Sequence, residues 1–411
     1  MEGGSATVDV GHWDGVTVYD LDSDGRAEVA VRVANGVTFG DGSKYTAAKD
    51  DAHQAIAILD GRTGAPRATA PVPDDYVADG PMYARFGVGY LDGSTPSLVA
   101  YMKNRIGRGG FNLMFTAWKF DGDTLGNQWK WLRGKGGGAD GHNTRIIDVD
   151  GDGKDEIAEI GFLLNGNGKL RYSLADEGIG HGDRFHIAEM DPRRPGLQGY
   201  GVQQDNPSGL REYYYNARTG VILWQHTAAG TADVGRGMAG DIDPRFPGME
   251  VWSFSGVHNA RKNKLTQPDP SLSPWPQLGL WWDGDLTLEL LNDGKIEKWN
   301  PADPSTSKGT PRLQTLWKYG AVNSGTANPA FVGDILGDWR EEAVYTDAAH
   351  DELIIFTTNQ PTATRLYTLA HNPAYRNSMT LKGYLQSHHV DYFLGAGMSK
   401  PPRPDITYAG G

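Results

Sequence analysis

The stretch Asp148-Val-Asp-Gly-Asp-Gly-Lys-Asp-Glu156, followed at once by the apolar Ile157, decides the fold of this chain. Acidic residues occupy its first, third, fifth and ninth positions, and a glycine occupies the sixth. A glycine-assisted turn of this kind directs alternate carboxylates toward one point, and several hard oxygen donors suit Ca²⁺. An EF-hand would instead place its closing glutamate at position twelve, between two helices. The stretch therefore predicts a calcium-binding turn that leads into a strand, and we call this pattern an acidic turn.

The acidic turn is repeated along the chain. A close copy spans residues 20–28, looser copies begin at Asp241 and Asp334, and a worn copy begins at Glu189. The copies that begin at Asp148, Glu189 and Asp241 are 41 and 52 residues apart. A period of about 40–50 residues made of short strands is typical of a β-propeller, although a two-layer β-sandwich array is an alternative. The repeat thus predicts an all-β protein built from small sheets.

Composition and turn signals support many short strands within one domain. The 411 residues include 56 glycines and 23 prolines, both of which favour turns. Glycine-containing turns that begin at Asp60, Asp121, Asn216 and Asp283 are predicted to be hairpins. No low-complexity linker interrupts the pattern, so we predict a single β-propeller domain over residues 1–411, which seven or eight blades would fill.

The two close copies of the acidic turn supply the predicted calcium ligands. In the looser copies proline or tryptophan interrupts the acidic positions, and an aspartate that caps the turn through backbone N–H groups is an equally good interpretation there. Even the close copies are interpreted as structural sites that clamp blade edges. The predicted calcium ligands are Asp20, Asp22, Asp24, Glu28, Asp148, Asp150, Asp152 and Glu156.

Charge and composition exclude several classes of function. The formal net charge is −12 without a lysine-arginine run, which argues against nucleic acid as a partner. No apolar run approaches the ~18 residues of a membrane helix. There is no cysteine, so a thiolate nucleophile and a disulfide scaffold are excluded. Residues 1–10 show no signal peptide, and we expect an extracellular monomer, with a cytoplasmic location as the alternative.

Three glycine-flanked polar segments precede predicted strands, where the loops of a propeller gather at its central face. They are 141–143 with His142, 180–186 with His181 and His186, and 233–238 with Arg236. A single loop histidine is more often solvated or bonded within a turn than functional. Three such segments, each leading toward an acidic turn, favour a functional site.

Seven motifs in order carry a resemblance to a known family. The chain resembles the bacterial rhamnogalacturonan lyases of polysaccharide lyase family 11 from about residue 12 to 407. This resemblance implies an eight-bladed, calcium-binding β-propeller, which is the fold we predict, and it indicates the propeller without the family's preceding β-sandwich region. The motifs are DLDSDGRAEVAV (20–31), DVDGDGKDEI (148–157), GHGD (180–183), DVGRGMAGDIDPR (233–245), WWDGD (281–285), ILGDWREE (335–342) and YFLG (392–395).

The resemblance also implies site residues. It implies an active-cleft metal of uncertain identity held by His142, His181, Asp183 and the position of Gln204, where the family has a glutamate. A neutral amide there should weaken a hard-cation site or favour metals that prefer imidazole. Arg236 and Tyr384 match the family's arginine and tyrosine, whereas the family's loop lysine is missing after Asn323 and its first-blade acid is replaced by Asn35. The expected substrate-binding residues are Asn35, Asn143, Asn323, Gly325 and Thr326.

The implied activity is cleavage of rhamnose-(1→4)-uronate bonds in an acidic plant or microbial polysaccharide, such as rhamnogalacturonan I, by β-elimination. This reaction removes the C5 proton of a uronate, so a metal or Arg236 must neutralise the carboxylate. Tyr384, Lys382 or His186 is the candidate base. Trp275 is a candidate to pack on a sugar, whereas Trp281 and Trp282 are interpreted mainly as core residues. A non-catalytic calcium-binding propeller and a glycoside hydrolase with paired carboxylates are the competing hypotheses.

Overall fold

The structure is a computed structural model, and the chain forms two compact units. Unit 1 comprises Met1–Glu177, Thr380–Tyr384 and Thr407–Gly411, and unit 2 comprises Gly178–Met379 and Leu385–Ile406. The structure describes residues 14–46, 53–107, 110–134, 139–324, 328–381 and 384–404.

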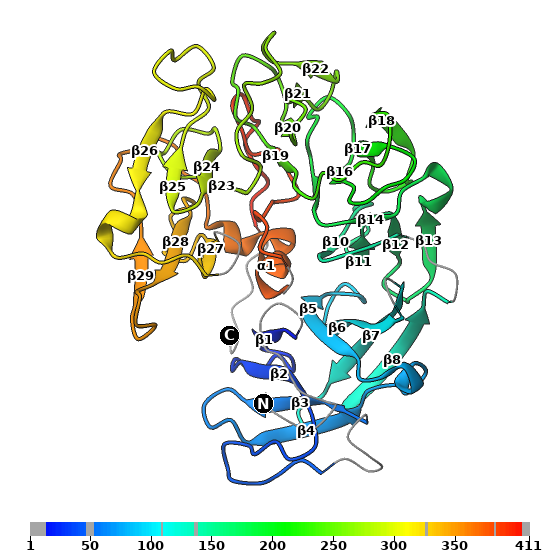
Figure 1. Cartoon of the computed structure of the whole chain (residues 1–411). Helices are drawn as coiled ribbons and strands as arrows, with labels where there is room; N and C mark the ends of the chain where they lie inside the picture. The colour runs from blue at the N-terminus through cyan, green and yellow to red at the C-terminus, as the bar shows by residue number, and fades with distance from the viewer. Residues whose placement is uncertain are drawn as a thin grey trace. The chain divides into compact units, whose positions relative to one another are not determined.

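Unit 1 contains three four-stranded antiparallel sheets, each a meander in which consecutive strands are neighbours (Figure 1). The first sheet is β1 (Val16–Tyr19), β2 (Glu28–Val33), β3 (Ala55–Asp60) and β4 (Pro66–Pro71). The second is β5 (Tyr83–Gly89), β6 (Ser97–Ile106), β7 (Gly110–Phe120) and β8 (Leu125–Leu132). The third is β10 (Thr144–Ile147), β11 (Glu156–Glu159), β12 (Phe162–Leu164) and β13 (Leu170–Ser173).

Unit 2 contains four further meanders, of which the last has three strands. They are β15 (Phe185–Ala188), β16 (Gln198–Val202), β17 (Leu210–Asn216) and β18 (Ile222–Thr227); then β19 (Met238–Gly240), β20 (Glu250–Trp252), β21 (Val257–Asn259) and β22 (Lys264–Leu265). The remaining two are β23 (Leu278–Leu280), β24 (Glu289–Asn292), β25 (Lys295–Glu297) and β26 (Arg312–Thr315); then β27 (Phe331–Gly333), β28 (Glu342–Thr346) and β29 (Leu353–Phe356).

A few short elements complete the described chain. They are the two-residue strands β9 (Asp140–Gly141) and β14 (His181–Gly182), the 3₁₀ turns η1 (Val77–Asp79), η2 (Ala175–Glu177), η3 (Leu316–Tyr319) and η4 (Leu369–His371), and the helix α1 (Pro373–Thr380).

The predicted number of eight blades is wrong, whereas the all-β propeller class holds. The described residues form seven blade-like sheets, three in unit 1 and four in unit 2. Long connections, such as residues 266–277 and 298–311, take up chain that the repeat length assigned to strands. The described part of residues 357–404 holds η4 and α1 and no strand, so an eighth sheet does not form there.

The acidic turns and hairpins explain how each sheet is connected. An acidic turn joins β1 to β2, where Glu28 Oε2 accepts the backbone N–H of Leu21 at 2.9 Å. The predicted hairpins at Asp60, Asp121 and Asn216 are confirmed, because these side chains accept N–H groups inside the turns β3–β4, β7–β8 and β17–β18. The predicted turn at Asp283 also joins antiparallel neighbours, β23 and β24, through a longer connection over residues 281–288.

Apolar side chains from the inner strands fill the interior of each unit. In unit 1 this core includes Ile58, Phe86 and Met114, and in unit 2 it includes Trp252 and Trp281; all five are at most 2% exposed. The fourth strands, such as β4 and β18, are only partly buried. In each sheet the middle strands are therefore more buried than the last strand, as in a propeller blade.

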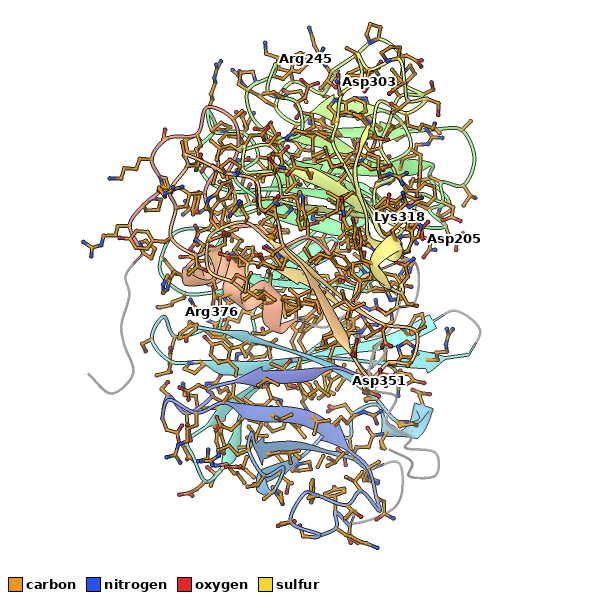
Figure 2. The ribbon with its side chains drawn as sticks, turned by 90° about the vertical axis from the view of Figure 1, so that its left-hand side faces the viewer. Asp205, Arg245, Asp303, Lys318, Asp351 and Arg376 are labelled. Atoms are coloured by element: carbon orange, nitrogen blue, oxygen red, sulfur yellow. The ribbon has the colours of Figure 1, made fainter. Side chains whose placement is uncertain are left out.

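Charged side chains occupy exposed loops and turns of unit 2, as Figure 2 shows for Asp205, Arg245 and Lys318. Among the residues that the structure describes, no helix combines the length and the apolar character needed to cross a membrane.

Candidate active site

The first acidic turn gathers three carboxylates in unit 1. Oxygen atoms of Asp20, Asp22 and Glu28 lie within 4.8 Å of one another. Arg67 of β4 binds two of them, with Nη2 2.9 Å from Asp22 Oδ2 and Nη1 2.7 Å from Glu28 Oε1. The fourth predicted ligand, Asp24, does not join this group; its Oδ1 accepts the N–H of Arg26 at 2.8 Å. The turn thus offers three carboxylates to a cation, and an internal guanidinium already contacts two.

The second acidic turn repeats this arrangement. Carboxylate oxygens of Asp148, Asp150 and Glu156 lie within 4.8 Å of one another, while Asp152 accepts a backbone N–H instead. Arg171 of β13 binds Asp150 Oδ2 at 2.8 Å and Glu156 Oε1 at 2.9 Å. Burial raises the pKa of Glu156 to about 7. Asp150 Oδ1 is buried and accepts no hydrogen bond from the described residues, so this turn fits a bound cation.

A third group of carboxylates was missed by the sequence analysis. In unit 2, oxygen atoms of Asp283, Asp285 and Glu289 lie within 4.8 Å of one another. Their spacing equals that of Asp150, Asp152 and Glu156, which is the signal that could have revealed them. The Nζ of Lys298 binds all three carboxylates, so a side chain neutralises this group.

The looser copies of the acidic turn use their carboxylates as caps. Asp334 accepts the N–H groups of Gly337 at 2.8 Å, Trp339 at 3.1 Å and Leu369 at 2.8 Å. Glu250 accepts the N–H groups that follow Asp241 in the other copy. These contacts match the capping interpretation, which the sequence left open beside calcium.

In unit 2 the structure brings His181, Asp183 and Arg236 into one neighbourhood. His181 Nε2 lies 3.7 Å from Asp183 Oδ1. Burial raises the pKa of Asp183, and the positive charges of His181, Arg184 and Arg236 act in the opposite direction. Gly235 has φ +65°, and a Cβ there would lie 3.4 Å from Asp183 Oδ2. The glycines of the DVGRG motif thus let the backbone approach this carboxylate.

Arg236 lies between a glutamine and an exposed aromatic pair. Its guanidinium donates a hydrogen bond to Gln277 Oε1, and its Cζ is 5.9 Å from the centroid of Trp275. Trp275 is 51% exposed and contacts the ring of Phe254, also 51% exposed, at 5.1 Å between centroids. The sequence analysis missed Gln277 and Phe254, since a glutamine and a phenylalanine outside any motif carry no signal of their own.

The remaining predicted residues of unit 2 occupy different surroundings. The backbone N–H of Gln204 donates to the carbonyl of His181 at 2.9 Å, so this residue lies beside the predicted metal ligand. Asn323 Nδ2 donates to Asp293 Oδ1 at 2.8 Å. The predicted residues Gly325 and Thr326 lie outside the described residues, as does Lys382.

His186 and the tryptophan pair belong to the interior of unit 2. His186 is 2% exposed, and its Nε2 lies 3.0 Å from the carbonyl oxygen of Gly237. Its ring contacts His389 edge-on at 5.3 Å between centroids. Trp281 and Trp282 are buried in two cores of unit 2, in agreement with the interpretation of this pair as packing residues.

Unit 1 holds His142, Asn143, Tyr384 and Asn35. The ring of Tyr384 stacks on that of His142 with centroids 4.4 Å apart. The carbonyl oxygen of His142 accepts a hydrogen bond from Arg85 Nη1 at 2.8 Å, which fixes this loop against β5. Asn143 is buried, and Asn35 is partly buried in the turn that follows β2.

A buried ionic cluster lies next to the His142 loop in unit 1. Lys103 Nζ binds Asp140 Oδ2 at 2.7 Å, and both side chains are nearly inaccessible to solvent. Burial lowers the pKa of Lys103 and raises that of Glu159 to about 8. Because these groups are buried, the cluster supplies no exposed acid or base.

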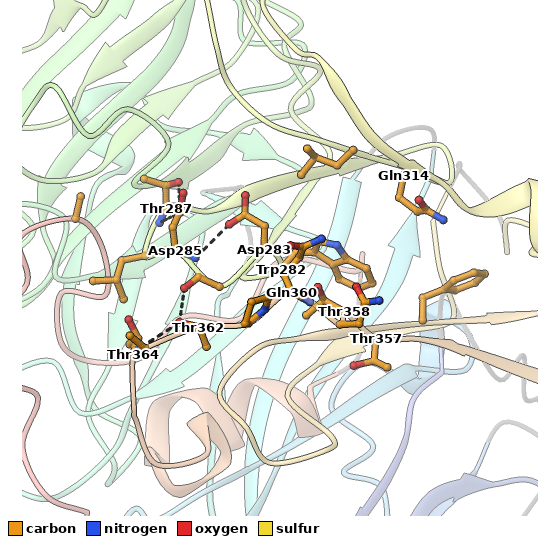
Figure 3. A pocket seen from close by; sticks show the side chains of 18 of the residues that line it. Trp282, Asp283, Asp285, Thr287, Gln314, Thr357, Thr358, Gln360, Thr362 and Thr364 are labelled. Carbon is orange, nitrogen blue, oxygen red and sulfur yellow. Dashed lines mark hydrogen bonds between the residues drawn. The ribbon is translucent and has the colours of Figure 1, made fainter.

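A groove of about 1260 Å³ with a mixed polar and apolar lining lies elsewhere in unit 2 (Figure 3). Threonine and glutamine side chains, including Thr358, Gln360 and Thr362, point into it beside Trp282 and Asp283. It is lined by part of the WWDGD motif, from Trp282 to Asp285, but by none of the predicted catalytic, substrate-binding or metal-ligating residues.

Comparisons with known proteins agree with the motifs. Residues 4–404 match the C-terminal domain of rhamnogalacturonan lyase family 11. The rhamnogalacturonan endolyase YesW of Bacillus subtilis (strain 168) is 37% identical over 423 residues, which cover 96% of this chain and 65% of that protein. The exolyase YesX of the same organism is 34% identical over 448 residues, covering 97% of this chain and 69% of YesX. The chain thus spans about two thirds of the length of these relatives.

A solved structure shows the same similarity. A Bacillus licheniformis rhamnogalacturonan lyase of family 11 aligns with a TM-score of 0.87 and 35% identity, over 98% of this chain and 71% of that one. With a family match over nearly all its residues, this chain belongs to rhamnogalacturonan lyase family 11.

Proposed function

We propose that this chain cleaves the rhamnose-(1→4)-uronate linkages of rhamnogalacturonan I, or of a related polymer, by β-elimination. The observation that carries the proposal is the neighbourhood of Arg236 in unit 2. A guanidinium lies there beside the Asp183–His181 pair and next to the exposed rings of Trp275 and Phe254. This arrangement provides both a positive charge for a uronate and an apolar face for a sugar ring.

The chemistry explains why the guanidinium is needed. The C5 proton of a uronate is removable only when the charge that develops on its carboxylate is neutralised. Arg236 can bind a carboxylate with two parallel hydrogen bonds, because its planar group matches the two oxygens. The hydrogen bond from Arg236 to Gln277 orients the guanidinium before substrate arrives. We assign Arg236 to binding the uronate carboxylate and stabilising the enolate-like transition state.

A cation fits the residues beside Arg236. Asp183 Oδ1 and His181 Nε2 lie 3.7 Å apart, so a cation could contact a carboxylate oxygen and an imidazole nitrogen together. Burial of Asp183, which raises its pKa, places this carboxyl group away from bulk solvent. When bound, a divalent cation supplies further neutralisation of an acidic sugar. His181 and Asp183 would hold it from unit 2, with Gln204 alongside, and His142 of unit 1 remains a predicted ligand.

Burial narrows the choice of residue for the base that takes the C5 proton. His186 faces a carbonyl oxygen in the interior and is 2% exposed, which leaves it poorly placed to reach a polymer. Tyr384 and Lys382 therefore remain the candidates, and Tyr384 is partly exposed beside His142. A phenolate at Tyr384 would take the C5 proton as the C4–C5 double bond forms and the C4–O bond breaks. The resulting phenol would return the proton to the oxygen that departs with the rhamnose-bearing product.

We further propose Ca²⁺ as the ion of the two close acidic turns. The donors there are carboxylate oxygens, and the unpartnered Asp150 Oδ1 supports an ion in the second turn. In each turn the cation and an arginine would share the negative charge. The role is structural, because these carboxylates lie in connections between strands of a single sheet.

The location follows from the proposed substrate. A polymeric polysaccharide is too large to enter a cell intact, so we propose that the protein acts outside the cell, as a monomer. Sedimentation of the purified protein would check the monomer.

An assay with two readouts tests the function. The protein is incubated with calcium and rhamnogalacturonan I, and in parallel with other rhamnose–uronate polymers. Ultraviolet absorbance of the C4–C5 unsaturated uronate and the number of reducing ends are followed together. We expect both to rise on at least one polymer. A rise in reducing ends alone would indicate a hydrolase. No rise in either readout would indicate a binding protein, and each of these two results would overturn the proposal.

A further inference from the structure

A second cluster of metal-ligating side chains lies in unit 2, apart from the predicted site residues. Glu212 of β17 and His226 of β18 are direct cross-strand partners, so their side chains lie on the same face of one sheet. His258 of β21 approaches them from the next sheet, with the rings of His226 and His258 4.7 Å apart between centroids. One ligand atom from each of the three residues lies within 4.8 Å of the others.

The carboxylate at the centre of the cluster is held firmly. Glu212 is 1% exposed, and its Oε2 accepts a hydrogen bond from the hydroxyl of Tyr200 at 2.5 Å. Its Oε1 accepts from Ser255 Oγ at 2.6 Å and lies 2.7 Å from His226 Nδ1. Three hydrogen-bonding side chains therefore fix the orientation of this carboxylate.

The imidazole of His226 is also oriented by a neighbour. Trp224 stacks on His226 with ring centroids 4.9 Å apart and an angle of 28° between the rings. The indole Nε1 of Trp224 in turn donates a hydrogen bond to the carbonyl of Ala260 at 2.8 Å. Contacts of this kind with surrounding residues fix ligand orientation in known metal sites.

An ion could reach the cluster from solvent. The side chain of His226 is 24% exposed, whereas Glu212 lies beneath it. An ion can therefore approach from the His226 side, and the carboxylate of Glu212 is buried below. An entry path is expected of a site that takes up a divalent ion.

We propose that Glu212, His226 and His258 bind one divalent transition metal of the zinc class. Two imidazole nitrogens and one carboxylate oxygen are a ligand set that suits Zn²⁺ and leaves a fourth position for water. Ca²⁺ prefers oxygen donors only, so this site differs in chemistry from the acidic turns. The bound ion would connect β17 and β18 of one sheet to β21 of the next.

The test is a zinc titration of the full chain by calorimetry, in buffer that contains excess calcium. The parent carries His181→Ala, so that an imidazole of the proposed active-site metal does not contribute. His258→Gln is added to that parent, and His350→Gln serves as a matched control because His350 is exposed and outside the cluster. Zinc content after gel filtration gives an independent stoichiometry.

We expect the parent and the His350→Gln control to bind one zinc ion per chain. Adding His258→Gln should weaken that binding by more than about tenfold, since it removes a direct ligand. In the parent, Co²⁺ should give the intense visible absorption of a tetrahedral site, and His258→Gln should abolish it. Absence of stoichiometric zinc in the parent, or equal zinc binding with and without His258, would overturn the proposal. Neither outcome depends on lyase activity.

Discussion

The ammonium group of Lys298 lies 2.7 Å from Glu289 Oε1, and it also binds the carboxylates of Asp283 and Asp285. Burial raises the pKa of Glu289 to about 7, and the ammonium opposes that rise. In unit 1, Arg67 and Arg171 contact their acidic turns in a comparable way. Lys298 thus neutralises the carboxylates of its own turn. In the two close acidic turns of unit 1 we assign part of that neutralisation to calcium.

Replacing Lys298 should make its turn dependent on a cation. We expect Lys298→Met to lower the free energy of unfolding by about 2 kcal/mol in chelator, because three carboxylates are left without their partner. Added calcium should restore part of this loss. Urea unfolding with and without calcium measures both effects, and Lys318→Met, at an exposed lysine, is the control. Equal stability of the Lys298 variant and the wild type would contradict this account.

Arg236 should be required for elimination. We expect Arg236→Ala to reduce kcat for formation of the unsaturated uronate by about 100- to 1000-fold, as is usual when a group that stabilises transition-state charge is removed. The initial rate of absorbance increase on rhamnogalacturonan I measures the loss. Arg218→Ala, at an exposed hairpin, should keep the wild-type rate. A near-normal kcat in Arg236→Ala would remove this residue from the mechanism.

The amide side chain of Gln204 should lower the affinity of the proposed active site for its metal ion. Gln204→Glu adds a negative charge beside His181, and we expect calcium to bind there about tenfold more tightly, as Coulomb attraction at short range predicts. Calorimetric titration of the variant against the wild type measures the change. Gln128→Glu adds the same charge on an exposed strand of unit 1 and should leave the affinity unaltered. Unchanged affinity in Gln204→Glu would place this side chain away from the ion.

Stability should fall as pH rises through the range in which Glu341 ionises. Burial raises the pKa of Glu341 from 4.5 to about 8. Because the folded-state pKa is the higher one, the stabilisation is complete below pH 4.5 and is lost as pH increases toward 8. Between pH 6 and 8, ionisation of this group should lower the free energy of unfolding by about 2 kcal/mol.

Glu341→Gln isolates that effect. An amide can accept the N–H of Trp281 and donate to the hydroxyl of Tyr375, the two partners of the carboxyl group. We expect the variant to lose stability less steeply than the wild type over this pH range in urea unfolding. Parallel pH profiles for the two proteins would show that Glu341 does not titrate there.

Much of the fold was predictable because it depends on local sequence. The turns at Asp60, Asp121 and Asn216 follow from side chains that bond the next few N–H groups, a relationship visible in any short segment. The blade number was not predictable in this way. It depends on whether residues 357–404 pair as strands, and that choice is decided by tertiary packing around α1.

The candidate site was predictable where motifs mark it and not elsewhere. His181, Asp183 and Arg236 come from glycine-flanked segments, and unit 2 brings them together. Lys298 and Gln277 act through contacts with residues on other strands or loops, and their own neighbours in sequence carry no pattern. The same holds for His226 and His258, which belong to different sheets.

The arginines of the acidic turns bear on how such a protein changes in evolution. Arg67 and Asp22 are 45 residues apart, Arg171 and Asp150 are 21 apart, and each pair belongs to one sheet and its turn. A gene segment that encodes one such sheet therefore carries its own counter-charge. Copying or deleting either of these two segments would therefore leave no acidic turn of the pair without its arginine.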